Sequence, residues 1–333
     1  MTSRIDLLDR PQPVVRHAPR PAEGGSAAVV VNPAKFESAD ALVRFQAEVE
    51  RALRAEGWLP PVWLPTTAES RGMAEARSAI AADVDLVLVA GGDGTVRTVA
   101  QELAGSGVAI GLLPSGTGNL LARNLGIPLG DVSAAVRFAC AGVSRPVDLG
   151  WMELDPAEDG VGGERFAFTV MGGAGFDAAI MSGASPEMKY RLGPVAYLVA
   201  AARALGGGMV DMTLSVDGAD ELTRSSRGFV VGNCGILTMG LALLPEADPS
   251  DGLLDSVVLL PRGLSGWARA AWSVVTRRRA HRLLPHFRGR RLEFRAATPQ
   301  LVEVDGDVVG EARHVRVRIQ RGAVLVRCAA PVR

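Results

Sequence analysis

The stretch that decides the fold is LVLVAGGDGT at residues 86–95, together with PSGTGN at residues 114–119. In the first stretch an apolar run ends in glycines around one carboxylate, Asp93, and a helical apolar pattern begins directly afterwards at Val96. This order predicts a buried strand, a loop that fits a phosphate group and a helix N-terminus. The second stretch repeats the order after the apolar residues 108–113. Two such loops at neighbouring strand ends predict a nucleotide pocket.

The first half of the chain, residues 26–146, alternates apolar strand patterns with amphipathic helix patterns. We expect strands at residues 27–31, 61–64, 84–90 and 108–113. We expect one helix with an apolar face at residues 42–53, and a second that a capping box at residues 66–69 opens and that ends near residue 82. Apolar strands separated by helices indicate an α/β domain with a parallel sheet covered on both faces. Ligands of such sheets bind at the carboxyl ends of the strands, where three loops of this chain fall: residues 32–33, 91–95 and 115–119.

The second half, residues 147–330, has a different pattern. Apolar and polar residues alternate in short segments around residues 212–216, 292–294 and 315–319. This period of two predicts antiparallel sheets, as in a β-sandwich domain, whose last strands either stay there or return to the first domain. We expect a helix at residues 186–204. Residues 1–25 are rich in Pro, Arg and Glu, and we expect a disordered tail there.

Composition excludes several classes of protein. The 333 residues carry no formal net charge, so no global field attracts nucleic acid, and we expect no nucleic-acid partner. The three cysteines, Cys140, Cys234 and Cys328, lack metal-type spacing and indicate buried thiols in a reducing compartment. No apolar run reaches the ~18 residues of a membrane span, and an apolar signal core is missing at the N-terminus. We therefore expect a cytoplasmic protein; a homodimer is compatible with the sequence, which does not determine the oligomeric state.

The basic side chains are nearly all arginine. Lys35 and Lys189 are the only lysines among 36 Lys and Arg residues. A codon bias toward arginine accounts for this composition.

The first glycine loop has the composition of a phosphate-binding loop. Three of its residues let the backbone turn tightly and approach a ligand closely, namely Gly91, Gly92 and Gly94. We expect the amides of Thr95 and Val96 to begin the helix and to point at phosphate oxygens. Asp93 would repel a triphosphate unless Mg²⁺ lay between them, so it is either a magnesium ligand or the base for an attacking hydroxyl. The alternative is a turn in which the Asp93 side chain caps the next helix.

The second loop offers a second cradle, made of Ser115, Gly116, Thr117, Gly118 and Asn119. Thr117 can donate to a phosphate, and Asn119 can bind a base, ribose or phosphate oxygen. Arg123, in the helix that follows, either reaches a phosphate or is a solvated helix residue. The chain contains no Walker loop, no Rossmann fingerprint and no nucleophile elbow near its histidines. These absences argue against a Walker-type nucleotidase, a dinucleotide enzyme of the Rossmann type and a Ser–His–Asp hydrolase.

In these motifs the chain resembles the diacylglycerol kinase catalytic-domain family, which includes bacterial diacylglycerol kinases, sphingosine kinases and ceramide kinases. The resemblance runs from about residue 28 to residue 326, with the motifs in family order. The matching segments are VNP at 31–33, GGDGT at 91–95, PSGTGNLLAR at 114–123, DLG at 148–150, GAGFDA at 173–178, Asn233, PEADPSDGLLD at 245–255 and DGD at 305–307. The Ser-Gly that usually follows the first motif is replaced by Ala34, Lys35 and Phe36.

The resemblance implies ATP- and Mg²⁺-dependent phosphorylation of a lipid hydroxyl, with diacylglycerol as the default substrate of the β-sandwich domain. It places the carboxylates of Asp93, Asp148 and Asp307 around the transferring phosphate. It assigns nucleotide binding to residues of the three loops and the helix after them: Asn32, Pro33, Gly91, Gly92, Gly94, Thr95, Ser115, Gly116, Thr117, Asn119 and Arg123. It implies Mg²⁺ at Asp93 and a structural Mg²⁺ at the Asp251 carboxylate with the Asp248 and Leu253 carbonyls.

One departure concerns Asp307, which stands where the family has glutamate. Its carboxylate is shorter by one C–C bond, about 1.5 Å, whereas a base has to come within ~3 Å of the proton that it takes. Either the backbone compensates, a water bridges the gap, or Asp93 is the base. Asp305 and Gly306 also fit a plain hairpin turn after a strand at residues 301–304.

Residues 262–295 contain ten arginines and two histidines against one acid, Glu293, with apolar residues between them. For part of this segment the composition predicts either a basic amphipathic helix on an anionic membrane or an ordinary helix packed on the sandwich. In the first alternative the protein binds peripherally to the inner face of the membrane.

Two rival functions stay open. One is another kinase of the same superfold, such as an NAD kinase or a phosphofructokinase, and PSGTGNLLAR favours the lipid branch over it. The other is a non-catalytic lipid- or nucleotide-binding protein, against which the three acidic residues argue.

Overall fold

The computed structural model describes residues 24–156, 163–175, 209–237, 240, 242–260, 266, 269 and 284–329. The chain divides into two compact units, Met1–Leu149 with Gln320–Arg333, and Gly150–Ile319. The division that the sequence pattern indicates, at residues 146–147, lies slightly earlier. None of the described helices has the length and apolar character needed to cross a bilayer.

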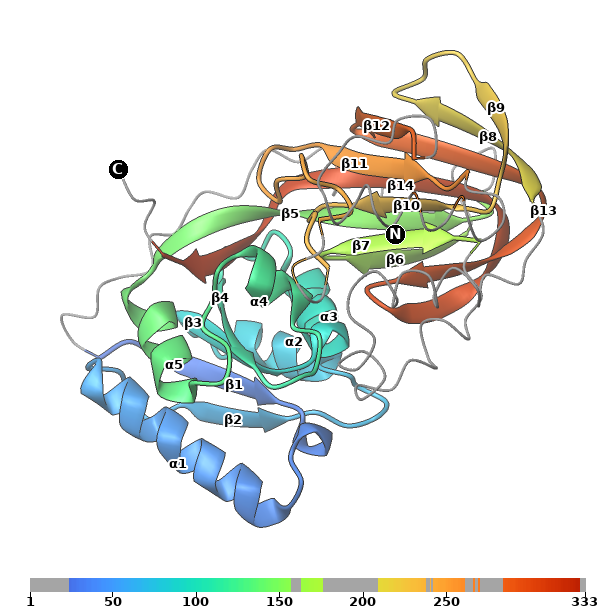
Figure 1. Cartoon of the computed structure of the whole chain (residues 1–333). Coiled ribbons are helices and arrows are strands. Elements are labelled where there is room, and N and C mark those ends of the chain that lie inside the picture. Colours follow the sequence, from blue (N-terminus) through green and yellow to red (C-terminus); the bar gives the residue numbers. More distant parts are fainter. Residues whose placement is uncertain are drawn as a thin grey trace. The chain divides into compact units, whose positions relative to one another are not determined.

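The first unit is built on a parallel sheet with the strand order β2-β1-β3-β4 (Figure 1). The strands are β1 (Ala27–Val31), β2 (Val62–Pro65), β3 (Leu86–Gly91) and β4 (Ala109–Pro114). The end of β14 (Asp307–Cys328) adds to β4 in parallel, at Leu325 and Val326. Every residue of β1 and β3 is buried, as expected of strands with helices on both faces. The predicted parallel α/β fold is confirmed.

Helices cover both faces of this sheet. They are α1 (Ala39–Ala55), α2 (Met73–Ala81), α3 (Asp93–Leu103), α4 (Leu120–Asn124) and α5 (Val132–Ala141), with a short 3-10 helix, η2 (Pro33–Lys35). Helices α1 and α5 pack together on one face, where Phe45, Leu53 and Val136 enter the core; α2 and α3 lie against each other on the opposite face (Figure 1). The face of α1 predicted from residues 42–53 is the one that packs.

The start of α2 differs from the predicted capping box. Thr67 and Ser70 form a local turn, in which the Ser70 N–H donates to Thr67 Oγ1 at 3.1 Å and the Thr67 N–H donates to Ser70 Oγ at 3.0 Å. Gly72, with a left-handed φ of +108°, separates this turn from Met73, where α2 begins. Short hydroxyl side chains compete with a helix for backbone groups, so the Thr-Glu spacing marked a turn instead of a helix start.

The second unit is an antiparallel β domain, as predicted. Its strands are β6 (Glu164–Phe168), β7 (Met171–Ala174), β8 (Val210–Val216), β9 (Leu222–Ser226), β10 (Phe229–Gly232), β11 (Leu254–Val258), β12 (His286–Gly289) and β13 (Arg291–Val304), with parts of β5 (Val143–Leu154) and β14. Strand β13 pairs with β8 at residues 292–296 and with β7 at residues 302–304. A register shift between Arg295 and Gln300 separates the two pairings. One long strand thus connects two groups of paired strands.

Apolar side chains from both groups meet in one core. Phe229 of β10 stacks on Phe294 of β13 with ring centroids 3.5 Å apart. Gly150, of the DLG segment, lies under Phe168, and a Cβ on that glycine would come within 2.1 Å of the ring. Only glycine fits this position without moving the phenyl ring.

Some predictions fall outside the described residues: the tail at 1–23, the helix at 186–204, residues 176–178 of GAGFDA, and nearly all of residues 262–283. The described end of the basic segment, residues 286–295, forms β12 and the start of β13. The helix expected in part of the segment therefore does not include residues 286–295, whereas the described residues 266 and 269 are helical. Arg291, Glu293 and Arg295 alternate with buried Leu292 and Phe294, which is a strand pattern.

Candidate active site

Three loops follow neighbouring parallel strands at the same edge of the first unit's sheet. Asn32 follows β1, Gly92 follows β3 and Ser115 follows β4. Backbone bonds join them: the Asn32 N–H donates to the Ala90 carbonyl at 2.8 Å, and the Ser115 N–H donates to the Gly91 carbonyl at 3.2 Å. The arrangement that the sequence predicts for these loops is therefore present.

The glycines of the two main loops lie where side chains would collide. A Cβ on Gly116 would come within 2.7 Å of the Gly92 Cα, and a Cβ on Gly118 within 2.5 Å of Asp93 Oδ2. A Cβ on Gly91 would lie 2.6 Å from that of Thr95. The loops are therefore in van der Waals contact, and their glycines are required by packing.

Asp93 links the two glycine loops. It is the first residue of α3, and its Oδ1 accepts a hydrogen bond of 2.6 Å from the Leu120 N–H at the start of α4. Burial raises the pKa of the Asp93 carboxyl, and the backbone N–H groups of Leu120, Asn119 and Leu121 oppose that rise. The alternative in which Asp93 caps the helix after its own turn is wrong, because Asp93 is the first residue of that helix and its carboxylate caps α4 instead.

The amides available at α3 differ from those predicted. Helix α3 begins at Asp93, so the Val96 N–H already donates to the Gly92 carbonyl at 3.0 Å. The expectation for Val96 is thus wrong, because the helix begins earlier than the apolar pattern suggests. The first-turn amides, which have no carbonyl partner within the helix, are those of Asp93, Gly94 and Thr95.

The polar side-chain atoms of Asn119 and Arg123 form hydrogen bonds within the second loop itself. Asn119, in a left-handed conformation with φ of +48°, accepts from the Gly116 N–H at 3.0 Å and donates to the Gly116 carbonyl at 2.7 Å. Arg123 Nε donates to the Gly118 carbonyl at 2.8 Å. Both side chains therefore shape this loop, whereas Thr117 is exposed.

The loop after β1 is tied to the first glycine loop. Asn32 Nδ2 donates to Thr95 Oγ1 at 3.4 Å, and Asn32 Oδ1 accepts from the Ala34 N–H at 3.1 Å, ahead of the turn that begins at Pro33. Lys35 ends that turn with its side chain directed at Gly92. Sequence reasoning did not assign Lys35 to the site, although its rarity among the basic residues was a signal.

Asp148 lies in the first unit and is only 2% exposed. Its Oδ1 accepts a hydrogen bond of 2.6 Å from the Gly322 N–H of β14. This contact gives the carboxylate of the DLG segment a structural function in joining β5 to β14. Its predicted catalytic function stays a prediction.

The hairpin between β13 and β14 carries Asp307 in the second unit. Asp305 and Gly306 form its turn with positive φ values of +47° and +89°, which is the geometry of a type I′ turn. Asp307 follows as an exposed residue opposite Val304. The alternative of a plain hairpin turn is thus correct for the backbone, and it leaves a function of Asp307 open.

Asp305 anchors this turn, and sequence reasoning missed that function. Its carboxylate is buried and accepts four hydrogen bonds of 2.8–3.0 Å, from the N–H groups of Thr169, Val170 and Met171 and from the Thr169 hydroxyl. Its own N–H donates to the Met171 carbonyl at 2.8 Å. Asp305 therefore fixes the backbone that presents Asp307.

The predicted structural Mg²⁺ segment forms a tight turn in the second unit. Asp248 Oδ1 accepts from the Ser250 N–H, and Asp251 Oδ1 accepts from the Leu253 N–H, both at 2.9 Å. Arg288 forms an ion pair with Asp251 Oδ2 and lies 3.4 Å from Asp255 Oδ2. Within the described ranges, no three His, Cys, Asp or Glu side chains are grouped closely enough to hold a metal ion by themselves.

Asp255 is the buried acid beside this turn. Its Oδ2 has no hydrogen-bond partner. Burial raises the pKa of Asp255 to about 6, against the lowering effect of Arg288. An under-coordinated carboxylate oxygen next to oxygen-rich backbone is compatible with a cation, although a cation bound by Asp251 has to displace Arg288.

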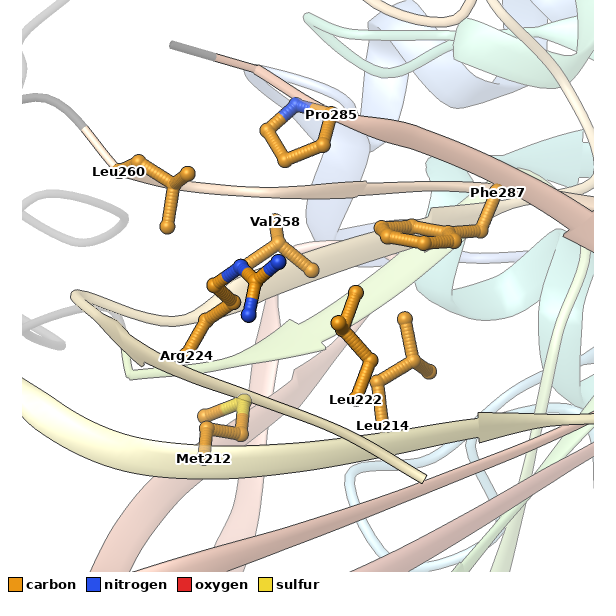
Figure 2. Close-up of a pocket in the computed structure, with 8 residues that line it drawn as sticks. All are labelled: Met212, Leu214, Leu222, Arg224, Val258, Leu260, Pro285 and Phe287. Carbon is orange, nitrogen blue, oxygen red and sulfur yellow. The ribbon is translucent and has the colours of Figure 1, made fainter. Parts of the chain in front are cut away.

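An apolar pocket of ≈ 240 Å³ lies in the second unit, between β8 and β9 on one side and β11 and β12 on the other (Figure 2). Seven apolar side chains and one cation line it: Met212, Leu214, Leu222, Arg224, Val258, Leu260, Pro285 and Phe287. Arg224 Nη1 donates to the Thr223 carbonyl at 2.9 Å. The pocket suits an apolar ligand segment that is smaller than a whole drug-sized molecule, for which ~300–1,000 Å³ is usual.

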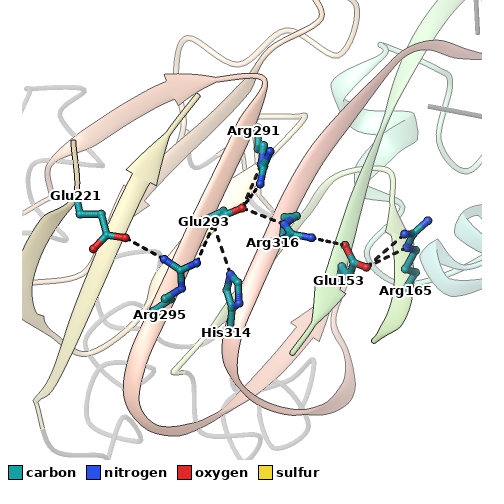
Figure 3. Close-up of polar contacts among 8 residues, drawn as sticks. All are labelled: Glu153, Arg165, Glu221, Arg291, Glu293, Arg295, His314 and Arg316. Carbon is teal, nitrogen blue, oxygen red and sulfur yellow. Dashed lines mark hydrogen bonds and ion pairs between the residues drawn. The ribbon is translucent and has the colours of Figure 1, made fainter. Parts of the chain in front are cut away.

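On the outer side of β13 and β14, charged residues form a chain of ion pairs (Figure 3). Glu293 is at its centre, with Arg316 Nε at 2.9 Å, an Arg295 nitrogen at 3.3 Å and Arg291 in a further ion pair. Burial alone would raise the pKa of Glu293, but the hydrogen bonds and charges of Arg291 and Arg316 lower it to about 2. Glu293, the one acid of the basic segment, therefore stabilises the sheet.

Two family models match the chain. The diacylglycerol kinase catalytic domain matches residues 26–152, and the YegS C-terminal NAD kinase beta sandwich-like domain matches residues 170–328. A probable lipid kinase YegS-like of Pseudomonas aeruginosa is 31% identical over 268 residues, which are 76% of this chain and 79% of that protein. The chain belongs to the diacylglycerol kinase and YegS-like lipid kinase family.

Other relatives agree with this assignment. A diacylglycerol kinase of Mycobacterium tuberculosis is 34% identical over 179 residues, which are 54% of this chain and only 56% of that protein. A crystal structure of a diacylglycerol kinase from Bacillus anthracis has a TM-score of 0.68 at 18% identity, covering 93% of this chain and 98% of that one. A second crystal structure from that bacterium, with the same coverage, has a TM-score of 0.74 at 20% identity. At these identities the two structures establish the fold alone.

Proposed function

We propose that the chain is an ATP- and Mg²⁺-dependent lipid kinase that phosphorylates the hydroxyl of diacylglycerol to give phosphatidic acid. The observation that carries the proposal is the half-buried Asp93, held by the Leu120 N–H between two glycine loops at the edge of a parallel sheet. Family membership supports the reaction type. A lipid substrate also favours a cytoplasmic enzyme that works peripherally at the inner membrane face.

In this proposal the phosphates of ATP rest on the three strand-end loops. The first-turn amides of α3 and the exposed Thr117 hydroxyl donate to phosphate oxygens, and the loop glycines allow close approach. Asn32, Asn119 and Arg123 act chiefly by holding the loops in place, since their side chains form hydrogen bonds within those loops. Pro33 and Ser115 provide backbone at the loop starts.

The Asp93 carboxylate is suited to binding a magnesium ion. Mg²⁺ keeps most of its ligands as water and substrate phosphate and needs only one or two carboxylates from a protein. One half-buried carboxylate therefore suffices, and a three-residue metal cluster is not required. Bound Mg²⁺ supplies neutralisation of the phosphate charge during transfer. We propose Asp148 as a third acid of the reaction and Asp248, Asp251 and Leu253 as the structural site.

The proton of the acceptor hydroxyl has two candidate bases. Burial raises the pKa of Asp93, which makes it a stronger base than an ordinary carboxylate. Asp307 is exposed on a turn that Asp305 holds in place. We expect the pH dependence of kcat to change in the Asp307→Asn variant if Asp307 is the base, and to stay as in the wild type if Asp93 is.

The pocket of the second unit supports a lipid acceptor. Its apolar lining and ≈ 240 Å³ match part of one acyl chain. We propose that the pocket holds an acyl segment of the substrate.

One experiment decides between the candidate functions. The protein is supplied with labelled ATP, Mg²⁺ and a total lipid extract, and the labelled product is identified by mass spectrometry. Phosphatidic acid is the expected product, and purified diacylglycerol should then serve as substrate. Labelled NADP in a parallel assay with NAD would favour the NAD kinase alternative. ATP binding without any phosphorylated product would favour a non-catalytic binding protein.

A further inference from the structure

We infer that Lys35 binds the phosphates of the nucleotide, an inference that rests on the proposed ATP-dependent activity. Lys35 is the last residue of η2, in the loop after β1. A Cβ built on Gly92 would lie 3.4 Å from Lys35 Cε and 3.7 Å from Lys35 Nζ. The same point lies 3.7 Å from the Gly116 Cα. The ammonium group therefore reaches the place where all three strand-end loops converge.

The positive groups around this point favour the binding of an anion. Gly92 is the N-cap of α3, so the helix directs its unpaired amides and the positive end of its dipole to this side. The Lys35 ammonium adds a second positive charge there, and the described residues provide no ion pair or hydrogen bond for it. Lys35 is exposed, so water screens its charge, and a phosphate at this point would interact favourably with both the ammonium group and the helix terminus. The acids of the three loops are Glu37, an exposed residue of the Lys35 loop, and Asp93, whose Oδ1 is already bonded to Leu120.

The identity of this cation also supports a specific function. Lys35 is one of only two lysines in a chain whose 36 Lys and Arg residues are otherwise arginine. An ammonium is a compact point charge on a flexible stem, whereas a guanidinium is planar and larger. The narrow space at Gly92, bounded by Gly116, favours the compact group.

Lys35 also stands in the segment where the chain departs from the family motif. Ala34, Lys35 and Phe36 replace the usual Ser-Gly, so this loop lacks the glycine that allows a close backbone approach. A charged side chain that reaches Gly92 provides a phosphate contact from the same loop by other means. Lys35 thus provides this loop with a contact to the nucleotide phosphates.

The test compares Lys35→Ala and Lys35→Arg with Arg51→Ala, a matched control that removes an exposed cation from α1. Binding of ATP and of adenosine is measured by calorimetry, and KM is measured for ATP and for diacylglycerol. We expect Lys35→Ala to weaken ATP binding about 10- to 100-fold, as for the loss of one charge-assisted hydrogen bond. Adenosine binding and the KM for diacylglycerol should not change, and Lys35→Arg should lie between wild type and Lys35→Ala.

The outcomes separate this inference from the proposed function. If the wild-type protein binds no ATP, both are overturned. If the wild type binds ATP but Lys35→Ala and Arg51→Ala bind it equally well, only the inference about Lys35 is overturned. Equal weakening of ATP and adenosine by Lys35→Ala would also overturn it, since that result indicates a disturbed loop. Thermal unfolding of each variant checks that the fold is intact.

Discussion

The Oδ1 oxygen of Asp93 accepts a hydrogen bond of 2.6 Å from the backbone N–H of Leu120, which lies 27 residues further along the chain. Leu120 begins α4, whose N-cap residue, Asn119, makes no side-chain cap of its own. The carboxylate therefore replaces a local cap and joins the loops after β3 and β4. Asp93 has two separable properties: an oxygen that accepts from Leu120, and a charge that can act on a cation.

Substitutions at Asp93 should separate these two properties. Asp93→Asn keeps an oxygen for Leu120 but removes the charge, so we expect kinase activity to fall by at least ~100-fold while Tm changes little. Asp93→Ala also removes the cap and should cost a further ~1 kcal/mol of stability. Steady-state assays and thermal unfolding measure the two effects. Near-normal turnover in Asp93→Asn would refute a charge-dependent function and leave a purely structural one.

The sequence predicts the first unit's sheet well because its strands are buried on both faces and therefore appear as continuous apolar runs. The sequence also predicts the place of the glycine loops, because these loops follow the ends of the apolar runs. It does not predict the start of α2, because the Thr67–Ser70 turn is a local competition between side chain and helix. It also misses Asp305, whose partners Thr169 and Met171 lie 136 and 134 residues away. Contacts between residues so far apart in the chain leave no periodic pattern in the sequence, so they cannot be predicted from it.

Asp305→Ala should destabilise the second unit strongly. The substitution leaves the N–H groups of Thr169, Val170 and Met171 without their acceptor in a buried place, which should cost about 3–5 kcal/mol in denaturant unfolding. Asp220→Ala, at an exposed position, is the matched control and should change stability by less than ~0.5 kcal/mol. At a temperature where Asp305→Ala is still folded, kcat should fall and the KM for ATP should not. A loss of stability below ~1 kcal/mol would contradict the anchoring function.

Glu293 should make the stability depend on acid pH. Its pKa of about 2 in the folded protein lies below the ordinary value of 4.5, so its contribution is complete above pH 4.5 and is lost as the pH falls toward 2. Glu293→Gln should remove about 1–3 kcal/mol at pH 7, after a discount for solvent screening, and should flatten the acid limb of the stability curve. Glu221→Gln, in an exposed pair with Arg295, should leave the curve unchanged. Equal stability curves for wild type and Glu293→Gln would disprove this contribution of Glu293.

A magnesium ion at the turn of Asp248 and Asp251 should raise Tm. At ten times its Kd, a ligand specific for the folded state adds about 1.4 kcal/mol, which corresponds to roughly 2–5 °C here. The effect should be larger at pH 8 than at pH 5, because Asp255, with a pKa of about 6, is neutral at the lower pH and then no longer attracts a cation. Asp251→Asn should abolish the Mg²⁺ effect, whereas Asp220→Asn should retain it. A Tm that does not respond to Mg²⁺ in the wild type would argue against this structural site.

The apolar pocket should determine how well long-chain lipids bind. Leu222 on β9 faces the pocket (Figure 2). Its neighbour Thr223 is exposed and is not one of the lining residues. Leu222→Asn keeps the side-chain size but removes apolar contact, and a loss of ~1.5 kcal/mol should raise the KM for long-chain diacylglycerol about tenfold. The KM for ATP should stay constant, short-chain diacylglycerols should be less affected, and Thr223→Asn should behave as wild type. An equal increase of KM for short and long chains would show that the pocket does not hold an acyl segment, because only a longer chain gains from an apolar lining.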